Sequence, residues 1–241
     1  MILLIQFRRD QSGWHELKCF YESLDLSYNQ IQIINAGSET ISSKEILSLA
    51  RKSKGIIIGG LGETGYGEIN VEKKFWFNNI REKMVFVLKK IIKKNQPPVL
   101  GICFGHQLLA ESLGAKVDFS PKQAETGVTK IHLTKEGMAD PLFKGFNSMF
   151  LAIEGHKDAV LNLPKKSLHL AYSHRCLIQA FRYKKFFYGL QFHPELNYKD
   201  FLFRLSLYPD YQKQKTVNQK PIVKTKLIFK NFLFQICDLR V

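Results

Sequence analysis

The sequence lacks the features that would place it in a specialised class of protein. It contains no run of about 18 apolar residues, so no membrane-spanning helix is expected. The opening run MILLIQF is short and precedes the first charges, which favours a core strand over a signal peptide. No internal repeat, zinc-finger motif or RNP motif is present. What remains is a chain of 241 residues, long enough for one large α/β domain or two small ones.

Cysteine and acidic residues are both scarce. The four cysteines, Cys19, Cys103, Cys176 and Cys237, are scattered without metal-site spacing, so we expect reduced thiols and a cytoplasmic location. The 36 lysines and arginines outnumber the 21 acidic residues, which gives a formal charge of +15. Such a charge can attract nucleic acid, but the lysines form small clusters typical of solvated surface. A nucleic-acid partner is therefore not favoured.

Apolar runs of strand length alternate with helical patterns in the first half of the chain, which predicts βαβ units and a mainly parallel sheet. The predicted strands cover residues 1–7, 31–36, 55–60 and 98–102, and the predicted helices cover 13–24, 43–53 and 75–94. Later strands are predicted at 126–135, 147–153, 168–173, 176–183 and 185–192, followed by a helix at 199–207. We expect one domain over residues 1–207 and a C-terminal tail over 208–241. The apolar end of the tail fits a helix or a strand, packed on the domain or on a partner.

A thiol stands where a strand is predicted to turn into a helix, in Gly101-Ile102-Cys103-Phe104-Gly105. This segment is the thiol counterpart of the nucleophile elbow G-x-S-x-G, in which larger flanking side chains would clash. The start of a helix favours negative charge and offers unpaired N–H groups, so it favours a thiolate and can bind an oxyanion. The alternative is that Cys103 is a small apolar filler, the usual role of a free cysteine.

A general base for this thiol is found in YGLQFHPEL, residues 188–196. His193 follows a predicted strand, and Pro194 takes the chain out of the sheet. His193 can accept the thiol proton, and Glu195 can orient the imidazole, as in a catalytic triad with a thiol nucleophile. The cysteine and the histidine both follow strand ends, where open α/β sheets bind ligands. A structural turn histidine is the alternative.

Together, GICFGHQLLA and GLQFHPE resemble the class I glutamine amidotransferase family, and within it the glutaminase half of GMP synthase. The resemblance covers roughly residues 40–200 and includes GIIIGG, GHKDAVLNLP and AYSHRCLIQAF. It implies a flavodoxin-like three-layer α/β sandwich with a central mainly parallel sheet. It also implies that Cys103 attacks the side-chain amide of glutamine, forms a γ-glutamyl thioester and releases ammonia. His193 would act as base and then acid with Glu195 as its partner, and no metal or other cofactor is needed.

The same resemblance assigns contacts to the substrate. It implies that the N–H groups of Gly60 and Phe104 form the oxyanion hole. Gln107 would contact the bound glutamine, and the backbone around Lys157 and Asp158 would hold its α-carboxylate. Two departures concern the substrate rather than the triad: position 61 is Leu where the family usually has Pro, and position 155 is Gly where it has Ser.

Three functions are compatible with these residues. A glutaminase would supply ammonia to a synthetase, as in GMP synthase and purine biosynthesis. Because the sequence has no P-loop and no S-G-G-x-D-S loop, that synthetase would be a separate chain. A γ-glutamyl peptide hydrolase would use the same triad without a partner. A non-catalytic basic interaction protein is disfavoured by the complete Cys–His–Glu set.

Overall fold

The structure is a computed structural model that describes residues 1–37, 40–62, 64–208 and 225–239. Its strands are β1 (Ile2–Gln6), β2 (Ile31–Asn35), β3 (Gly55–Ile58), β4 (Val99–Ile102), β5 (Val117–Phe119), β6 (Glu125–Leu133), β7 (Met149–His156), β8 (Asp158–Val160), β9 (Ser167–Tyr172), β10 (Ala180–Tyr183) and β11 (Phe187–Leu190). Its helices are α1 (Gln11–Leu24), η1 (Tyr28–Gln30), α2 (Ser43–Lys52), α3 (Val71–Lys94), α4 (Phe104–Ser112), α5 (Lys135–Ala139), η2 (Pro141–Phe143), α6 (Tyr198–Leu207), α8 (Leu227–Asn231) and η3 (Phe232–Ile236). None of these helices combines the length and the hydropathy needed to cross a lipid bilayer.

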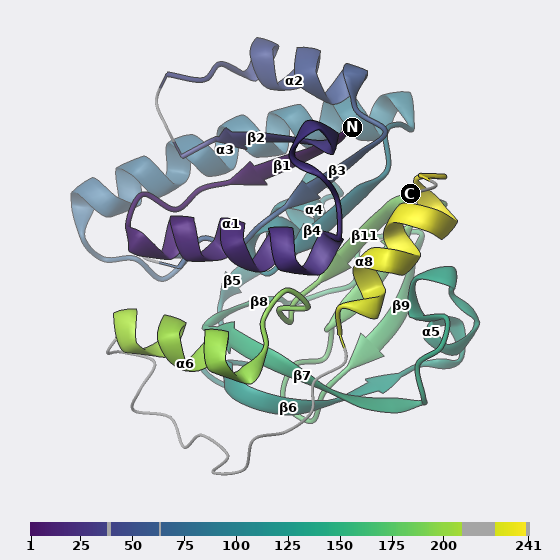
Figure 1. The fold of residues 1–241 in the computed structure, drawn as a ribbon. Coiled ribbons are helices and arrows are strands. Elements are labelled where there is room, and N and C mark those ends of the chain that lie inside the picture. The colour runs from purple at the N-terminus through teal and green to yellow at the C-terminus, as the bar shows by residue number, and fades with distance from the viewer. Residues whose placement is uncertain (38–39, 63, 209–224, 240–241) are drawn as a thin grey trace.

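The centre of the molecule is a nine-stranded sheet in the order β2-β1-β3-β4-β11-β10-β9-β6-β7. The first five strands in this order run parallel to their neighbours. The remaining strands extend the sheet by antiparallel pairing, and β5 and β8 form a separate small sheet. Helices cover both faces of the parallel part (Figure 1). The predicted flavodoxin-like sandwich around a mainly parallel centre is confirmed, with an antiparallel extension at one side.

Each face of the parallel sheet buries its own layer of helices. On β1, Leu3 and Ile5 pack against residues of α2, α3 and α4, whereas Ile2 and Leu4 pack against α1 and the C-terminal helices. This division follows from the strand geometry, since successive side chains point to opposite faces. The continuous apolar runs in the predicted strands therefore reflect burial on both sides.

The C-terminal segment, residues 225–239, completes the layer that begins with α1. Phe229, Phe232 and Leu233 are buried there, and the ring of Phe229 contacts Phe20 of α1 edge-on with centroids 5.9 Å apart. Figure 1 shows α8 lying beside α1 on the same face of the sheet. The apolar end of the predicted tail is thus helical and packs on the domain. The division of the chain at residue 207 stays a prediction.

The turn between β4 and α4 consists of Cys103. Its backbone angles, φ 53° and ψ −102°, lie outside the regions that L residues usually occupy. Close backbone approaches surround it, because Gly101 packs against the backbone of Gly105, which in turn packs against Ile58. The N–H group of Gly105 also donates to the carbonyl oxygen of Gly59, 3.2 Å away. The predicted elbow is present, and its sharpness depends on the two flanking glycines.

Gly101→Ala is expected to destabilise the protein by about 3 kcal/mol, because the new Cβ would overlap the backbone of Gly105 at the start of α4. The midpoint of urea unfolding measures this change. Gly155→Ala is the matched control, since a Cβ at that position meets no atom within 4 Å, and we expect a change below about 0.5 kcal/mol. Equal stability of the two variants would contradict a tightly packed elbow.

Candidate active site

Neighbouring parallel strands bring the predicted nucleophile and base to one edge of the sheet. β4 and β11 are paired, with Leu190 in register with Ile102. The N–H group of Cys103 donates to the carbonyl oxygen of Leu190 at 2.8 Å. His193 follows β11, and its N–H group donates to the carbonyl oxygen of Ile153 on β7 at 2.8 Å. Both side chains are therefore anchored by backbone hydrogen bonds at the ends of their strands.

Gly60 marks the place where the two side chains meet. A Cβ built on Gly60 would lie 3.3 Å from Cε1 of His193 and 3.7 Å from Cβ of Cys103. Since both distances start from the same point, the imidazole and the thiol-bearing carbon are close neighbours. The structure thus brings together two residues that the sequence places in separate motifs.

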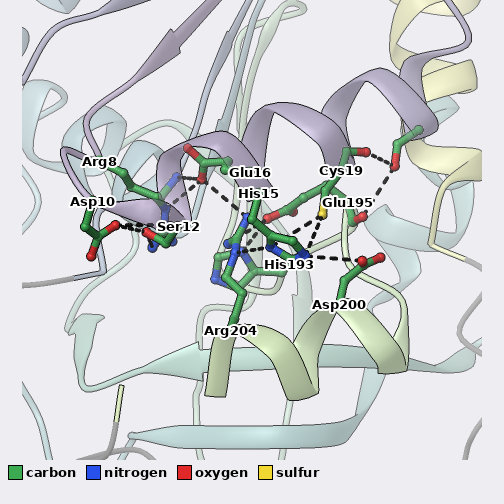
Figure 2. A network of polar contacts seen from close by, with 12 residues as sticks. Arg8, Asp10, Ser12, His15, Glu16, Cys19, His193, Glu195, Asp200 and Arg204 are labelled. Atoms are coloured by element: carbon green, nitrogen blue, oxygen red, sulfur yellow. Dashed lines mark hydrogen bonds and ion pairs between the residues drawn. The ribbon is translucent and has the colours of Figure 1, made fainter. Parts of the chain in front are cut away.

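His193 is held by a buried carboxylate. Its Nδ1 lies 2.8 Å from Oε1 of Glu195, and both side chains are almost fully buried (Figure 2). Burial by itself would raise the pKa of Glu195, but the imidazole of His193 and the guanidinium of Arg204 lower it to about 2. The ionised carboxylate can only accept, so Nδ1 carries the ring proton. Nε2 of the neutral ring is then left to accept a proton.

The thiol of Cys103 keeps its proton in the ligand-free site. Burial raises its pKa to about 12, although the charge of Arg8 acts in the opposite direction. The carboxylate of Glu195 raises the pKa further. The expectation that the start of α4 favours a thiolate is therefore wrong for this ligand-free state, because desolvation outweighs the helix dipole. Proton transfer to His193 has to accompany attack on a substrate.

Alkylation of Cys103 by iodoacetamide is expected to accelerate roughly tenfold per pH unit between about pH 7 and 10, because only the thiolate reacts. With a pKa of about 12, the thiolate fraction keeps rising over this whole range. Mass spectrometry of the Cys103 peptide gives the rate and separates it from the three other free thiols, which are buried. A rate that reaches a plateau below about pH 8 would show that the thiolate forms readily without substrate.

The two predicted oxyanion donors differ in their surroundings. The N–H group of Phe104 lies at the first position of α4, where backbone N–H groups have no partner within the helix. The N–H group of Gly60 donates to Oε1 of Glu16, 3.2 Å away. In this structure the second predicted donor is therefore engaged by a carboxylate from α1, which the sequence did not indicate.

The predicted substrate contacts line one cavity beside the thiol. Its wall includes Cys103, Phe104, Gln107, Lys157 and Asp158. Nε2 of Gln107 donates to the carbonyl oxygen of Asp158 at 3.1 Å, which fixes the amide against the start of β8. Sequence motifs far apart in the chain thus form one wall.

The loop that departs from the family pattern closes this cavity. Leu61 is buried and lines it. The backbone N–H of Tyr66 donates to Oδ2 of Asp158 at 3.0 Å, and the hydroxyl of Tyr66 donates to Glu111 at 2.8 Å. The unusual loop is therefore tied to the same Asp158 that the resemblance assigns to substrate binding.

A second cavity, of about 50 Å³, has His193 but not Cys103 in its wall. Three ionisable residues that the sequence analysis did not identify also line it: Arg8, Glu154 and Arg204. Arg8 lies two residues beyond the end of β1. Strand ends are where open α/β sheets bind ligands, so this position was the signal that could have revealed it.

Two clusters of described residues have donor atoms close enough for a metal ion, and the first is His15, Cys19 and Asp200. Nε of Arg204 donates to Nδ1 of His15 at 3.3 Å, so Nε2 of the neutral ring carries the proton toward Oδ1 of Asp200, 3.2 Å away. Burial lowers the pKa of His15, which keeps the ring neutral. With both ring nitrogens engaged and a guanidinium beside them, this cluster does not fit a cation.

The second cluster is Glu125, His156 and Cys176, all of them buried. Nδ1 of His156 lies 2.9 Å from the carbonyl oxygen of Asp158 and donates to it, which leaves Nε2 facing Oε2 of Glu154 at 3.5 Å. Burial raises the pKa of Glu154 well above its usual value. This carboxyl therefore keeps a proton, and it lies close to Nε2 of His156 without a hydrogen bond between them.

Comparisons with known proteins agree with this geometry. Curated relatives include a subunit of glutamine-hydrolyzing GMP synthase from Methanopyrus kandleri, which is 39% identical over 106 residues, or 43% of this chain and 54% of the relative. The corresponding protein of Methanocaldococcus jannaschii is 39% identical over 105 residues, or 43% of this chain and 54% of the relative. The chain thus spans about half the length of these curated relatives.

The fold has solved counterparts as well. A glutamine amidotransferase of Thermotoga maritima superimposes with a TM-score of 0.67 at 21% identity, covering 98% of this chain and 97% of that one. The model of the family described as glutamine amidotransferase class-I matches residues 26–202, which is most of the chain and includes Cys103, His193 and Glu195. The chain therefore belongs to the class-I glutamine amidotransferase family.

Proposed function

We propose that this protein hydrolyses the side-chain amide of glutamine to glutamate and ammonia. The observation that carries the proposal is the meeting of Cys103 and His193 beside Gly60, with His193 held by Glu195. The relatives named as subunits of glutamine-hydrolyzing GMP synthase support the same reaction. Their names also support a separate synthetase chain as the receiver of the ammonia.

The reaction needs one nucleophile and one group that moves protons. Nε2 of His193 takes the proton of Cys103 as the sulfur bonds to the amide carbon of glutamine. The same imidazole then gives that proton to the nitrogen as the carbon–nitrogen bond breaks and ammonia leaves. Water, deprotonated by His193, attacks the γ-glutamyl thioester and releases glutamate and the thiol. Glu195 keeps the imidazole oriented and stabilises its positive charge throughout.

Hydrolysis of a γ-glutamyl compound larger than glutamine is the second candidate. The observation that favours it is the cavity of about 50 Å³ beside His193, the residue that protonates the leaving group. A cavity of this size holds a few water molecules, so it has room for a small amine in place of ammonia. Such an enzyme would act without a synthetase.

The two candidates are separated by assaying the purified chain on L-glutamine and on γ-glutamyl dipeptides. Release of ammonia from glutamine, together with labelling of Cys103 by the glutamine analogue 6-diazo-5-oxo-L-norleucine, supports the first. Turnover of dipeptides at a kcat/KM well above that for glutamine supports the second. Absence of both turnover and labelling, even when a GMP synthetase chain is added, would contradict both.

A further inference from the structure

The segment after β1 places a buried arginine, Arg8, in the site. The reaction described above assigns no role to this residue. Arg8 has an exposed fraction of 5%, and its guanidinium is fixed on two sides (Figure 2). Its Nε donates to Oε1 of Glu16 at 3.1 Å. Its Nη1 donates to the hydroxyls of Ser12 and Tyr208 at 3.1 and 3.0 Å. These contacts hold the guanidinium in one orientation.

The remaining nitrogen of Arg8 faces the reacting groups. The contacts of Arg8 with other described residues use Nε and Nη1, and none uses Nη2. A Cβ built on Gly60 would lie 3.1 Å from this Nη2, and the same point lies close to His193 and Cys103. Arg8 also lines both cavities. Its Nη2 group therefore lies in the same neighbourhood as His193 and Cys103.

Glu16 explains why the oxyanion needs a hydrogen-bond donor other than the N–H group of Gly60. One carboxylate oxygen of Glu16 accepts from both Arg8 and the N–H group of Gly60. Burial acts to lower the pKa of Arg8, but Glu16 and Tyr208 together with Cys103 raise it above its usual value, so the guanidinium stays charged. The carboxylate thus occupies the backbone donor and anchors a cation next to it.

We propose that Arg8 is a catalytic residue that stabilises the oxyanion of the tetrahedral intermediates through its Nη2, in the place of the N–H group of Gly60. This role rests on the proposed function and refines it. As the thiol attacks, the electron pair of the carbonyl moves to its oxygen, and the charged guanidinium donates a hydrogen bond to that oxygen. Arg8 loses no proton and forms no covalent bond. Phe104 supplies the second donor.

Arg8→Met is expected to lower kcat for glutamine by about 10²–10³-fold with KM changed only a few-fold, the loss typical of one oxyanion donor. Arg8→Lys should recover part of that loss, because it keeps the charge without the planar fork. The pH dependence of Cys103 alkylation should move to higher pH in Arg8→Met, because the charge that opposes the raised thiol pKa is gone. Arg9→Met is the matched control, since Arg9 is the adjacent residue, is exposed and stacks on Trp76 at 3.8 Å.

Loss of Arg8 leaves the buried Glu16 with Arg204, 4.0 Å away, as its remaining ion-pair partner. A double variant, Arg8→Met with Glu16→Gln, therefore guards against simple unfolding. A double variant that folds like the wild type and keeps kcat within about threefold would overturn the role of Arg8. A pH dependence of Cys103 alkylation that is the same in Arg8→Met as in the wild type would also overturn this role. A wild type that neither turns over glutamine nor forms a thioester contradicts the proposed function itself, whereas an active wild type matched by Arg8→Met contradicts Arg8 alone.

Discussion

Cys103→Ala is expected to lower glutamine hydrolysis by at least about 10⁴-fold, because no other group can form the thioester. Cys103 is the free cysteine that lines the cavity beside the predicted substrate contacts. It shares a neighbourhood with His193, since both lie within 4 Å of a Cβ built on Gly60. Ammonia release in the steady state gives the rate. Mass spectrometry of protein quenched during turnover should show a γ-glutamyl adduct on the wild type and none on the variant.

Cys237→Ala is the matched control for this experiment. Cys237 is another free cysteine, but it is buried on the C-terminal segment with its sulfur beside Gly55, at the start of β3. Removal of the Cys237 thiol should leave kcat within about twofold of the wild type, because a change far from the site does not alter the surroundings of Cys103. A Cys103→Ala protein that still hydrolyses glutamine at a comparable rate would rule out covalent catalysis by this thiol.

Glu195→Gln is expected to lower kcat by about 10³–10⁴-fold while the fold is kept. The carboxylate now accepts from Nδ1 of His193 at 2.8 Å, which leaves Nε2 free to take the thiol proton. A glutamine amide at this position can donate to Nδ1 instead, and the ring proton then moves to Nε2, where it blocks the base. Steady-state assays at pH 7 to 9 measure the loss.

Glu22→Gln provides the comparison for the loss of a carboxylate. Glu22 lies on the exposed side of α1 and pairs with Lys18 at 3.5 Å, so its removal should change kcat by less than about twofold. The pKa of Glu195 is about 2, so its own titration does not limit activity near neutral pH. Activity of Glu195→Gln within about fivefold of the wild type would show that the carboxylate does not set the tautomer.

Local patterns indicated the residues of the proposed triad because each of them follows a strand of the parallel sheet. Such strands are buried on both faces, so they appear in the sequence as continuous apolar runs. Their ends meet at one edge, which places Cys103 and His193 together without any knowledge of side-chain contacts. The start of α3 was predicted less well: the helix begins at Val71, because the side chain of Asn70 accepts from the N–H group of Lys73 at 3.0 Å.

Contacts between elements could not be predicted in the same way. Arg8 and Glu16 have ordinary local sequences, and their importance comes from the third partner, Gly60, which lies just beyond the end of β3. The high pKa of the Cys103 thiol has the same origin, since burial is a property of the assembled site. The packing of the C-terminal segment was also left open, because an apolar pattern does not say which surface covers it.

The packing of residues 225–239 affects when, during synthesis of the chain, the active site can form. The hydroxyl of Thr225 donates to the carbonyl oxygen of Pro194, 3.1 Å away, so the segment also braces the turn that carries His193. Chains leave the ribosome from the N-terminus, and the sheet strands are made first. The part of this face that α1 does not cover thus stays open, and the turn unbraced, until this segment has been synthesised. The site is therefore completed late, only after the C-terminal segment has been made and has packed on the sheet.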